Sequence, residues 1–149
     1  MRAVVTRVLH ADARVDDTIV GALPGPGLLV LLGVTHGDGP AQARALAATV
    51  WNLRILRGER SAADSGAPVL VVSQFTLYAD TRKGRRPSWS AAARGEQAAP
   101  VYERFCSELE ALGAVVERGA FGADMAVRST NDGPVTLILE QAPPTHPAH

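Results

Sequence analysis

Two short segments of the chain hold residue types that could do chemistry. The first is Ser73-Gln74-Phe75-Thr76-Leu77, where an apolar run ends in a hydroxyl, an amide and several backbone N–H groups. The second is Asn131-Asp132-Gly133-Pro134-Val135-Thr136, where a Gly-Pro peptide separates two strand-like runs. Asp-Gly is a common hairpin turn, but a following proline lacks the N–H that would pair across the hairpin. Together the segments indicate a small hydrolytic or binding pocket built from backbone groups rather than charged catalytic side chains.

A hydroxyl at a strand end, such as that of Ser73 or Thr76, is a nucleophile only if a base lies within hydrogen-bond reach. The candidate bases are His10 and His36, and neither stands in a pattern typical of a catalytic triad. The Gly-x-Ser-x-Gly pattern of the nucleophile elbow is absent. The commoner role of such hydroxyls is to satisfy backbone groups, and a Thr76 nucleophile stays open as an alternative.

The sequence predicts neither a metal nor a cofactor. Its histidines and its single cysteine, Cys106, show no metal-ligand spacing. Residues 21–27 are rich in glycine but lack the spacing of phosphate-binding loops. Cys106 lies in an expected helix, where a core thiol is the simplest interpretation.

A basic segment follows the first pocket segment. Its cations are Arg82, Lys83, Arg85 and Arg86, and Trp89 comes directly after them. Exposed cations bind phosphates and an aromatic ring can stack on a base, although a solvated surface loop has the same composition. Lys+Arg and Asp+Glu both total 15, so only a local patch of this kind could hold a nucleic acid. Its closeness to Thr76 favours a polyanion that reaches the same pocket.

Hydrophobic periodicity predicts the elements that position these segments. The expected strands are residues 3–9, 13–20, 28–34, 69–77, a strand that starts at 115, 125–130 and 135–140. One helix is expected from Pro40 to about Leu56, and a second from Pro100 to Gly113. Residues 57–67 and 80–94 are expected to be loops.

Strands mixed with two helices predict an α/β or α+β domain. The length of 149 residues is typical of one domain, which we expect to span residues 1–140. Residues 141–149 contain three prolines and are expected to form a disordered tail. One cysteine, no signal peptide and no apolar run of membrane-spanning length predict a cytoplasmic protein with no membrane partner.

The chain resembles the D-aminoacyl-tRNA deacylase (D-tyrosyl-tRNA(Tyr) deacylase) family over nearly its full length. Residues 1–8 and 27–34 are similar to the family's first and third strands. Residues 72–88 match its first signature almost letter for letter, and residues 121–125 and 131–136 match the rest. Residues 56–68 differ, because they lack the Lys-Met-Asn-like stretch that family members often carry.

The resemblance implies a homodimer with a barrel-like mixed sheet and two main helices. It implies hydrolysis of the ester between a D-amino acid and the 3′-terminal adenosine of tRNA, and action on glycyl-tRNA mischarged on tRNA-Ala. It implies a cis Gly133-Pro134 peptide that enters the partner's pocket, holds the substrate's α-amino group and excludes an L side chain.

The resemblance also assigns roles to individual residues. Catalysis would use Ser73, Gln74, Phe75 and Thr76, with backbone N–H groups stabilising an oxyanion and the substrate's ribose 2′-hydroxyl assisting. Arg7, Met125 and Asn131 would support the Gly-Pro peptide, although a strand-end ion pair and a core methionine explain Arg7 and Met125 as well. Two alternatives remain, a non-catalytic tRNA-binding module and an esterase with a Thr76 nucleophile.

Overall fold

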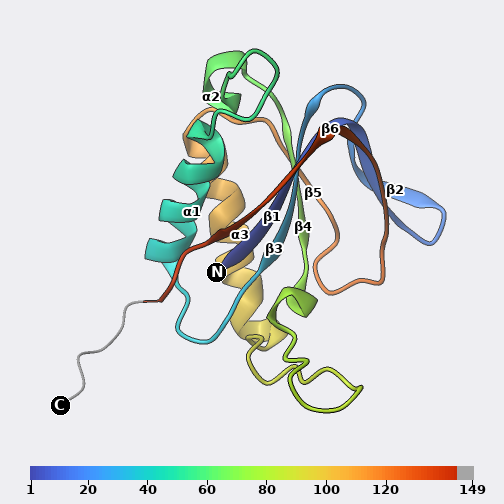
Figure 1. Ribbon diagram of the computed structural model, residues 1–149, viewed down its shortest axis with the longest axis vertical. Helices are drawn as coiled ribbons and strands as arrows, with labels where there is room; N and C mark the ends of the chain where they lie inside the picture. The colour runs from blue at the N-terminus through green and yellow to red at the C-terminus, as the bar shows by residue number, and fades with distance from the viewer. Residues whose placement is uncertain (144–149) are drawn as a thin grey trace.

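The computed structural model describes residues 1–143, and its sheet is organised around one long strand, β1 (Arg2–Val15) (Figure 1). β1 pairs antiparallel with β3 (Gly27–Gly33) along its first half and with β2 (Thr18–Leu23) along its second. On its other edge β1 pairs antiparallel with β6 (Ala126–Glu140). Nearly every backbone group of β1 therefore has a partner on one side or the other.

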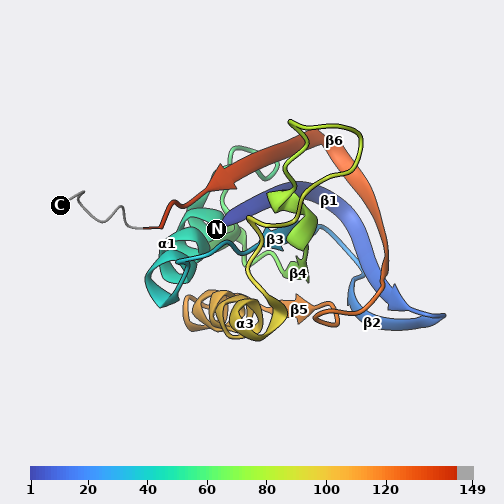
Figure 2. The same cartoon turned by 90° about the horizontal axis from the view of Figure 1, so that it is seen from below.

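Two further strands extend the sheet in parallel. β4 (Val69–Ser73) pairs with β3, and β5 (Val116–Arg118) pairs with β4. The strand order is β2-β1-β3-β4-β5, with β6 joined to β1. Figure 2 shows how strongly this sheet curves, so that β2 comes to lie beside β5. The predicted mixed, barrel-like sheet is confirmed.

Gly21 allows β2 and β5 to approach each other. A Cβ atom built on Gly21 would meet the carbonyl oxygen of Arg118 closer than real Cβ atoms are found. Gly21 is buried, and its own backbone φ does not demand glycine. The absence of a side chain there is therefore a packing requirement of the nearly closed barrel.

Helices α1 (Pro40–Asn52) and α3 (Gly95–Ala111) cover one face of the sheet (Figure 1). The predicted helix residues Leu46, Val50 and Phe105 are buried there against β3 and β4. A second buried cluster, which includes Leu29, fills the inside of the curved sheet. β3 is thus covered on both faces, which is what its continuous apolar sequence predicted.

Cys106 lies in the helix-covered core, as predicted. Its side chain is fully buried. Burial raises the pKa of the thiol to about 12, so the group stays protonated at neutral pH.

Two predicted strands end earlier than expected. The run 13–20 is broken by a turn, since β1 ends at Val15 and Asp16 has a positive φ of 51° before β2 begins. The run 69–77 ends at Ser73, where the chain turns into the 3-10 helix η1 (Phe75–Tyr78). The first break falls at the polar pair Asp16-Asp17, which marked the turn in the sequence. The second falls at Gln74, beyond which the apolar residues Phe75 and Leu77 still suggested strand.

The helix predictions also need correction. α3 begins at Gly95 rather than Pro100, because the Arg94 carbonyl already accepts hydrogen bonds from the next turn, and Pro100 lies inside the helix. The expected loop 57–67 contains a short helix, α2 (Ala62–Ser65), whose N-terminus is capped by Ser61.

The last two predicted strands are one strand, and the Gly-Pro segment is not a hairpin. Both halves of β6 pair with β1, from Thr6↔Thr136 on one side to Val8↔Asn131 on the other. Residues 132–135 therefore stand opposite a single residue of β1 and form a wide bulge. We call residues 132–135 the Gly-Pro bulge.

The predicted tail, residues 141–149, falls mostly outside the described residues, which end at 143. Gln141 itself continues the pairing beyond β6, since its N–H donates to the Met1 carbonyl at 2.9 Å. Within residues 1–143, no helix combines the length and hydropathy of a membrane span.

We expect Gly21→Ala to destabilise the protein by about 1–3 kcal/mol, because the new methyl group would force β2 and β5 apart. The measurement is the free energy of unfolding from urea titration. Gly25→Ala is the matched control, since a Cβ at Gly25 meets no atom within 4 Å. Equal stability of the two variants would contradict this account of barrel closure.

Candidate active site

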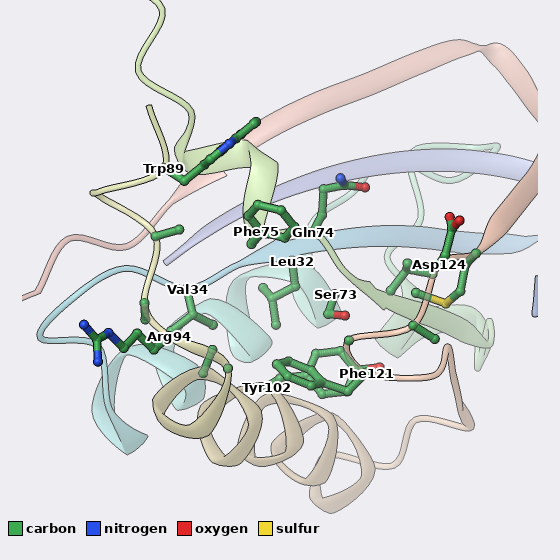
Figure 3. A pocket seen from close by; sticks show the side chains of 18 of the residues that line it. Leu32, Val34, Ser73, Gln74, Phe75, Trp89, Arg94, Tyr102, Phe121 and Asp124 are labelled. Carbon is green, nitrogen blue, oxygen red and sulfur yellow. The ribbon is translucent and has the colours of Figure 1, made fainter. Parts of the chain in front are cut away.

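A cavity of about 730 Å³ opens where β4 ends, between the loop that precedes α3 and the loop that follows β5 (Figure 3). Ser73, Gln74 and Phe75, all predicted site residues, line it. The parallel β3–β4–β5 ladder brings these chain segments to one edge of the sheet. The location agrees with the rule that ligands bind at the carboxyl ends of parallel strands.

The turn from β4 into η1 leaves backbone donors free at this edge. The Gln74 N–H donates to the Leu32 carbonyl at 2.8 Å, which fixes the start of the turn. Within residues 1–143, no backbone acceptor outside η1 takes a hydrogen bond from the N–H of Phe75 or Thr76. The first N–H groups of a helix have no intrahelical partner, so these two can serve a ligand.

The Thr76 hydroxyl is occupied within its own turn. Its oxygen accepts a hydrogen bond from the Gln74 side-chain amide. His10 is bonded to Thr130 at 2.9 Å and His36 to the Ser90 carbonyl at 2.7 Å, so neither histidine serves Thr76. Within residues 1–143, the hydrogen bonds of Thr76, His10 and His36 therefore do not link the three side chains.

Two aromatic pairs stand on either side of Ser73 (Figure 3). Phe75 and Trp89 pack edge-on with ring centroids 5.2 Å apart. Tyr102 and Phe121 pack at 5.5 Å. The Tyr102 hydroxyl donates to the buried Val71 carbonyl at 2.7 Å, and burial raises its pKa. The cavity therefore has rigid apolar walls and a polar strip of backbone between them.

Sequence reasoning missed part of this wall. It did not single out Tyr102, and it included Phe121 only in the match of residues 121–125. No local pattern marked this aromatic pair, because the two rings meet only when α3 packs beside the loop that follows β5.

Met125 also lies at the cavity rather than beside the Gly-Pro bulge of its own chain. Its sulfur is 3.3 Å from the Ala120 N–H, and its side chain packs against the buried cluster inside the barrel. A Cβ on Gly119 would lie 2.9 Å from that sulfur, so the loop backbone closes tightly on Met125.

Two of the predicted supporting residues, Asn131 and Arg7, hold the Gly-Pro bulge through hydrogen bonds. The Asn131 side chain accepts from the Val135 N–H at 2.9 Å and donates to the Thr136 hydroxyl at 2.8 Å, so it spans the bulge. Arg7 donates to the Asp132 carbonyl at 2.9 Å. The Gly133-Pro134 peptide is cis.

The structure does not bring the two pocket segments of the sequence together. None of the residues that line the cavity belongs to 131–136. Gly133 instead lies beside the Arg7 guanidinium, which would be 2.7 Å from a Cβ at that position. Within one chain, the cavity and the Gly-Pro bulge are separate features.

The basic segment forms a loop closed at its base. Asp80 and Ser88 exchange two backbone hydrogen bonds of 2.8 Å, and Trp89 then packs on Phe75 at the cavity. Arg82 pairs with Asp80 at 2.7 Å, and its hydrogen bonds lower the pKa of that carboxyl to about 2. The remaining cations are exposed and have no carboxylate partner within residues 1–143. They are Lys83, Arg85 and Arg86.

The described residues contain no group of three or more His, Cys, Asp or Glu side chains placed to hold a metal ion.

Comparison with known proteins shows the family to which the chain belongs. The family model described as D-Tyr-tRNA(Tyr) deacylase matches residues 4–140. The chain belongs to the D-Tyr-tRNA(Tyr) deacylase family. It is 63% identical to a D-aminoacyl-tRNA deacylase of Kineococcus radiotolerans over 140 residues, which are 94% of this chain and 99% of that one. It is 61% identical to the D-aminoacyl-tRNA deacylase of Thermobifida fusca, with the same coverage.

Two solved structures share the fold of this chain. A structure described as c-Myc DNA Unwinding Element Binding Protein is 35% identical, with a TM-score of 0.89 over 95% of this chain and 99% of that one. A probable eukaryotic D-amino acid tRNA deacylase shares the fold, with a TM-score of 0.82 over 93% of this chain and 97% of that one, at 17% identity. The family resemblance drawn from the sequence is confirmed.

Proposed function

We propose that this chain hydrolyses the ester bond of D-aminoacyl-tRNA and releases a free D-amino acid and tRNA. The observation that carries the proposal is its identity of 63% and 61%, over almost the full length, to proteins named D-aminoacyl-tRNA deacylase. The cavity supports it, because the N–H groups at the start of η1 could stabilise the oxyanion of an ester and the aromatic walls could hold a nucleoside.

The reaction would take place at the end of β4. The tRNA's terminal adenosine would enter the cavity, where aromatic side chains such as Phe121 and Trp89 offer surfaces for stacking. The N–H groups of Phe75 and Thr76 would stabilise the oxyanion that develops at the ester carbonyl. The substrate's own 2′-hydroxyl would assist, which fits the lack of a base beside Thr76.

Chiral selection would require a second copy of the chain. The cavity of one copy lacks residues 131–136, while the Gly-Pro bulge stands away from it. In a homodimer the partner's bulge would enter the cavity, bind the α-amino group through its carbonyls and leave no room for an L side chain. Glycine has no side chain, so glycyl-tRNA mischarged on tRNA-Ala would pass the same filter.

A Thr76 nucleophile is the second candidate mechanism. The hydrogen bond from the Gln74 amide orients the Thr76 hydroxyl, which favours a defined role. The amide nitrogen that makes this contact donates a hydrogen bond and is not a base, so it does not activate the hydroxyl. A non-catalytic tRNA-binding module is the third alternative and rests on the basic loop alone.

We expect purified protein to clear D-tyrosyl-tRNA and glycyl-tRNA and to leave L-tyrosyl-tRNA intact. The measurement is loss of labelled amino acid from tRNA with time, at neutral pH and physiological salt. If D-tyrosyl-tRNA persists while a known deacylase clears it in the same tube, the proposal is wrong. Binding of tRNA without turnover would point to the binding module.

We expect Thr76→Ala to retain activity within about tenfold of the wild type, because backbone donors survive the substitution. Loss of a true nucleophile reduces kcat by orders of magnitude, about 10⁶-fold in a well-studied serine protease. Single-turnover deacylation of D-tyrosyl-tRNA distinguishes the two outcomes, with Thr76→Ser as the control that keeps a hydroxyl. A loss of more than a thousandfold in the alanine variant alone would establish Thr76 as the nucleophile.

We expect the triple variant Lys83→Ala/Arg85→Ala/Arg86→Ala to bind tRNA more weakly and with less dependence on salt. Each phosphate contact contributes about 0.7–0.9 to the slope of log K against log salt, so the slope should fall by about 2–3. Filter binding between low and physiological salt measures it. Arg44→Ala, an exposed arginine on α1, is the control. An unchanged slope in the triple variant would exclude the basic loop from the tRNA contact.

A further inference from the structure

The Gly-Pro bulge needs more support than an ordinary strand, because four of its residues face one residue of β1. Asn131 and Arg7 fix its inner side through the contacts described above. On its outer side, the only charged side chain of the bulge is that of Asp132. The partners of Asp132 therefore decide how firmly that side is held.

Asp132 is held by an arginine from a distant part of the chain. Arg57 donates from Nη2 to Oδ1 of Asp132 at 2.6 Å and from Nε to Oδ2 at 3.3 Å. This two-point contact fixes the plane of the carboxylate as well as its position. The Asp132 side chain is only 13% exposed, and the hydrogen bond from Arg57 lowers its pKa, so it stays ionised.

Arg57 projects from a turn that is itself fixed. The Leu56 N–H donates to the Arg60 carbonyl at 2.9 Å, and Gly58 and Glu59 both take positive φ values between them. The Arg60 side chain in turn donates to the Asp64 carbonyl in α2 at 2.9 Å. Arg57 therefore acts from a closed turn rather than from a free loop.

Arg7 links the same two segments a second time. Its Nη1 donates to the Ile55 carbonyl at 3.0 Å, while its Nε donates to the Asp132 carbonyl. Its Nε is also 3.4 Å from the Asp132 carboxylate. One carboxylate thus lies between two guanidinium groups, and residues 55–57 and the Gly-Pro bulge are joined as one unit.

We propose that Arg57 is a positioning residue for chiral selection. It holds Asp132 and thereby fixes the position of the Gly-Pro bulge relative to β1. The inference rests on the proposed function, since it concerns how the bulge would reject an L side chain. Rejection by steric exclusion depends on position, and a small displacement of the excluding group admits the wrong substrate.

The effect should be moderate because the Arg57 side chain is 72% exposed. Exposed ion pairs contribute little, although a two-point arginine contact to a sheltered carboxylate lies at the upper end of the range. We expect Arg57→Ala to reduce the ratio of kcat/KM for D-tyrosyl-tRNA to that for L-tyrosyl-tRNA by about two- to fivefold. Both substrates carry the same tRNA, so changes in tRNA binding cancel in this ratio.

The experiment compares wild type, Arg57→Ala, Arg57→Lys and the control Arg54→Ala, an exposed arginine with no carboxylate partner within residues 1–143. L-tyrosyl-tRNA hydrolysis is followed with enzyme in excess so that slow turnover is measurable. We expect Arg57→Lys to recover part of the ratio and Arg54→Ala to match the wild type. Hydrogen exchange of the Val135 amide, which Asn131 holds, should increase in Arg57→Ala while exchange in β3 and β4 stays unchanged.

A double-mutant cycle separates positioning from a general structural role. If Arg57 acts through Asp132, then Arg57→Ala has no further effect on the ratio in an Asp132→Ala background. Additive losses, or an unchanged ratio in Arg57→Ala with unchanged Val135 exchange, would overturn the inference while the proposed function stands. If the wild type does not hydrolyse D-tyrosyl-tRNA at all, the proposed function fails first and the inference falls with it.

Discussion

Strand β1 is hydrogen-bonded along both edges, and the positions of the cavity and the Gly-Pro bulge follow from that pairing. Its first half lies between β3 and β6, and its second half between β2 and β6. Because β3 carries β4 and β5 in parallel, the cavity forms at their carboxyl edge. Because β6 places four residues opposite the single residue Arg7, the Gly-Pro bulge forms on the opposite edge of β1.

The cavity and the bulge use two different kinds of support. The cavity is built from apolar walls and backbone donors, and a hydrogen bond from Tyr102 to a buried carbonyl fixes one wall. The bulge is held by charge, with Asp132 between Arg7 and Arg57. Packing fixes a binding surface without placing charges beside the ester, whereas the bulge stands at the surface and has too few apolar contacts to be fixed by packing alone.

The difference between the cavity and the Gly-Pro bulge matters for a reaction that would distinguish D from L substrates by their shape. An oxyanion site of backbone N–H groups treats D and L esters alike, since it sees only the carbonyl. Discrimination must come from a rigid group near the α-carbon, and the cavity of a single chain offers no such group from the Gly-Pro bulge. On the proposed function, catalysis and chiral selection would use residues from different copies of the chain, which fits the separation of the cavity and the Gly-Pro bulge within one copy.

The sequence by itself determined the two main helices, the doubly covered β3 and both pocket segments, because hydrophobic period and local motifs are properties of neighbouring residues. It misjudged the segment 125–140, where it predicted two separate strands on either side of Gly133-Pro134. Only pairing of both runs with β1 makes them one strand, and that pairing joins residues more than 110 positions apart, such as Arg14 with Ala126. The contact between Arg57 and Asp132 and the turn of Tyr102 toward Ser73 were likewise decided by tertiary structure, since each depends on where distant elements pack and not on local sequence.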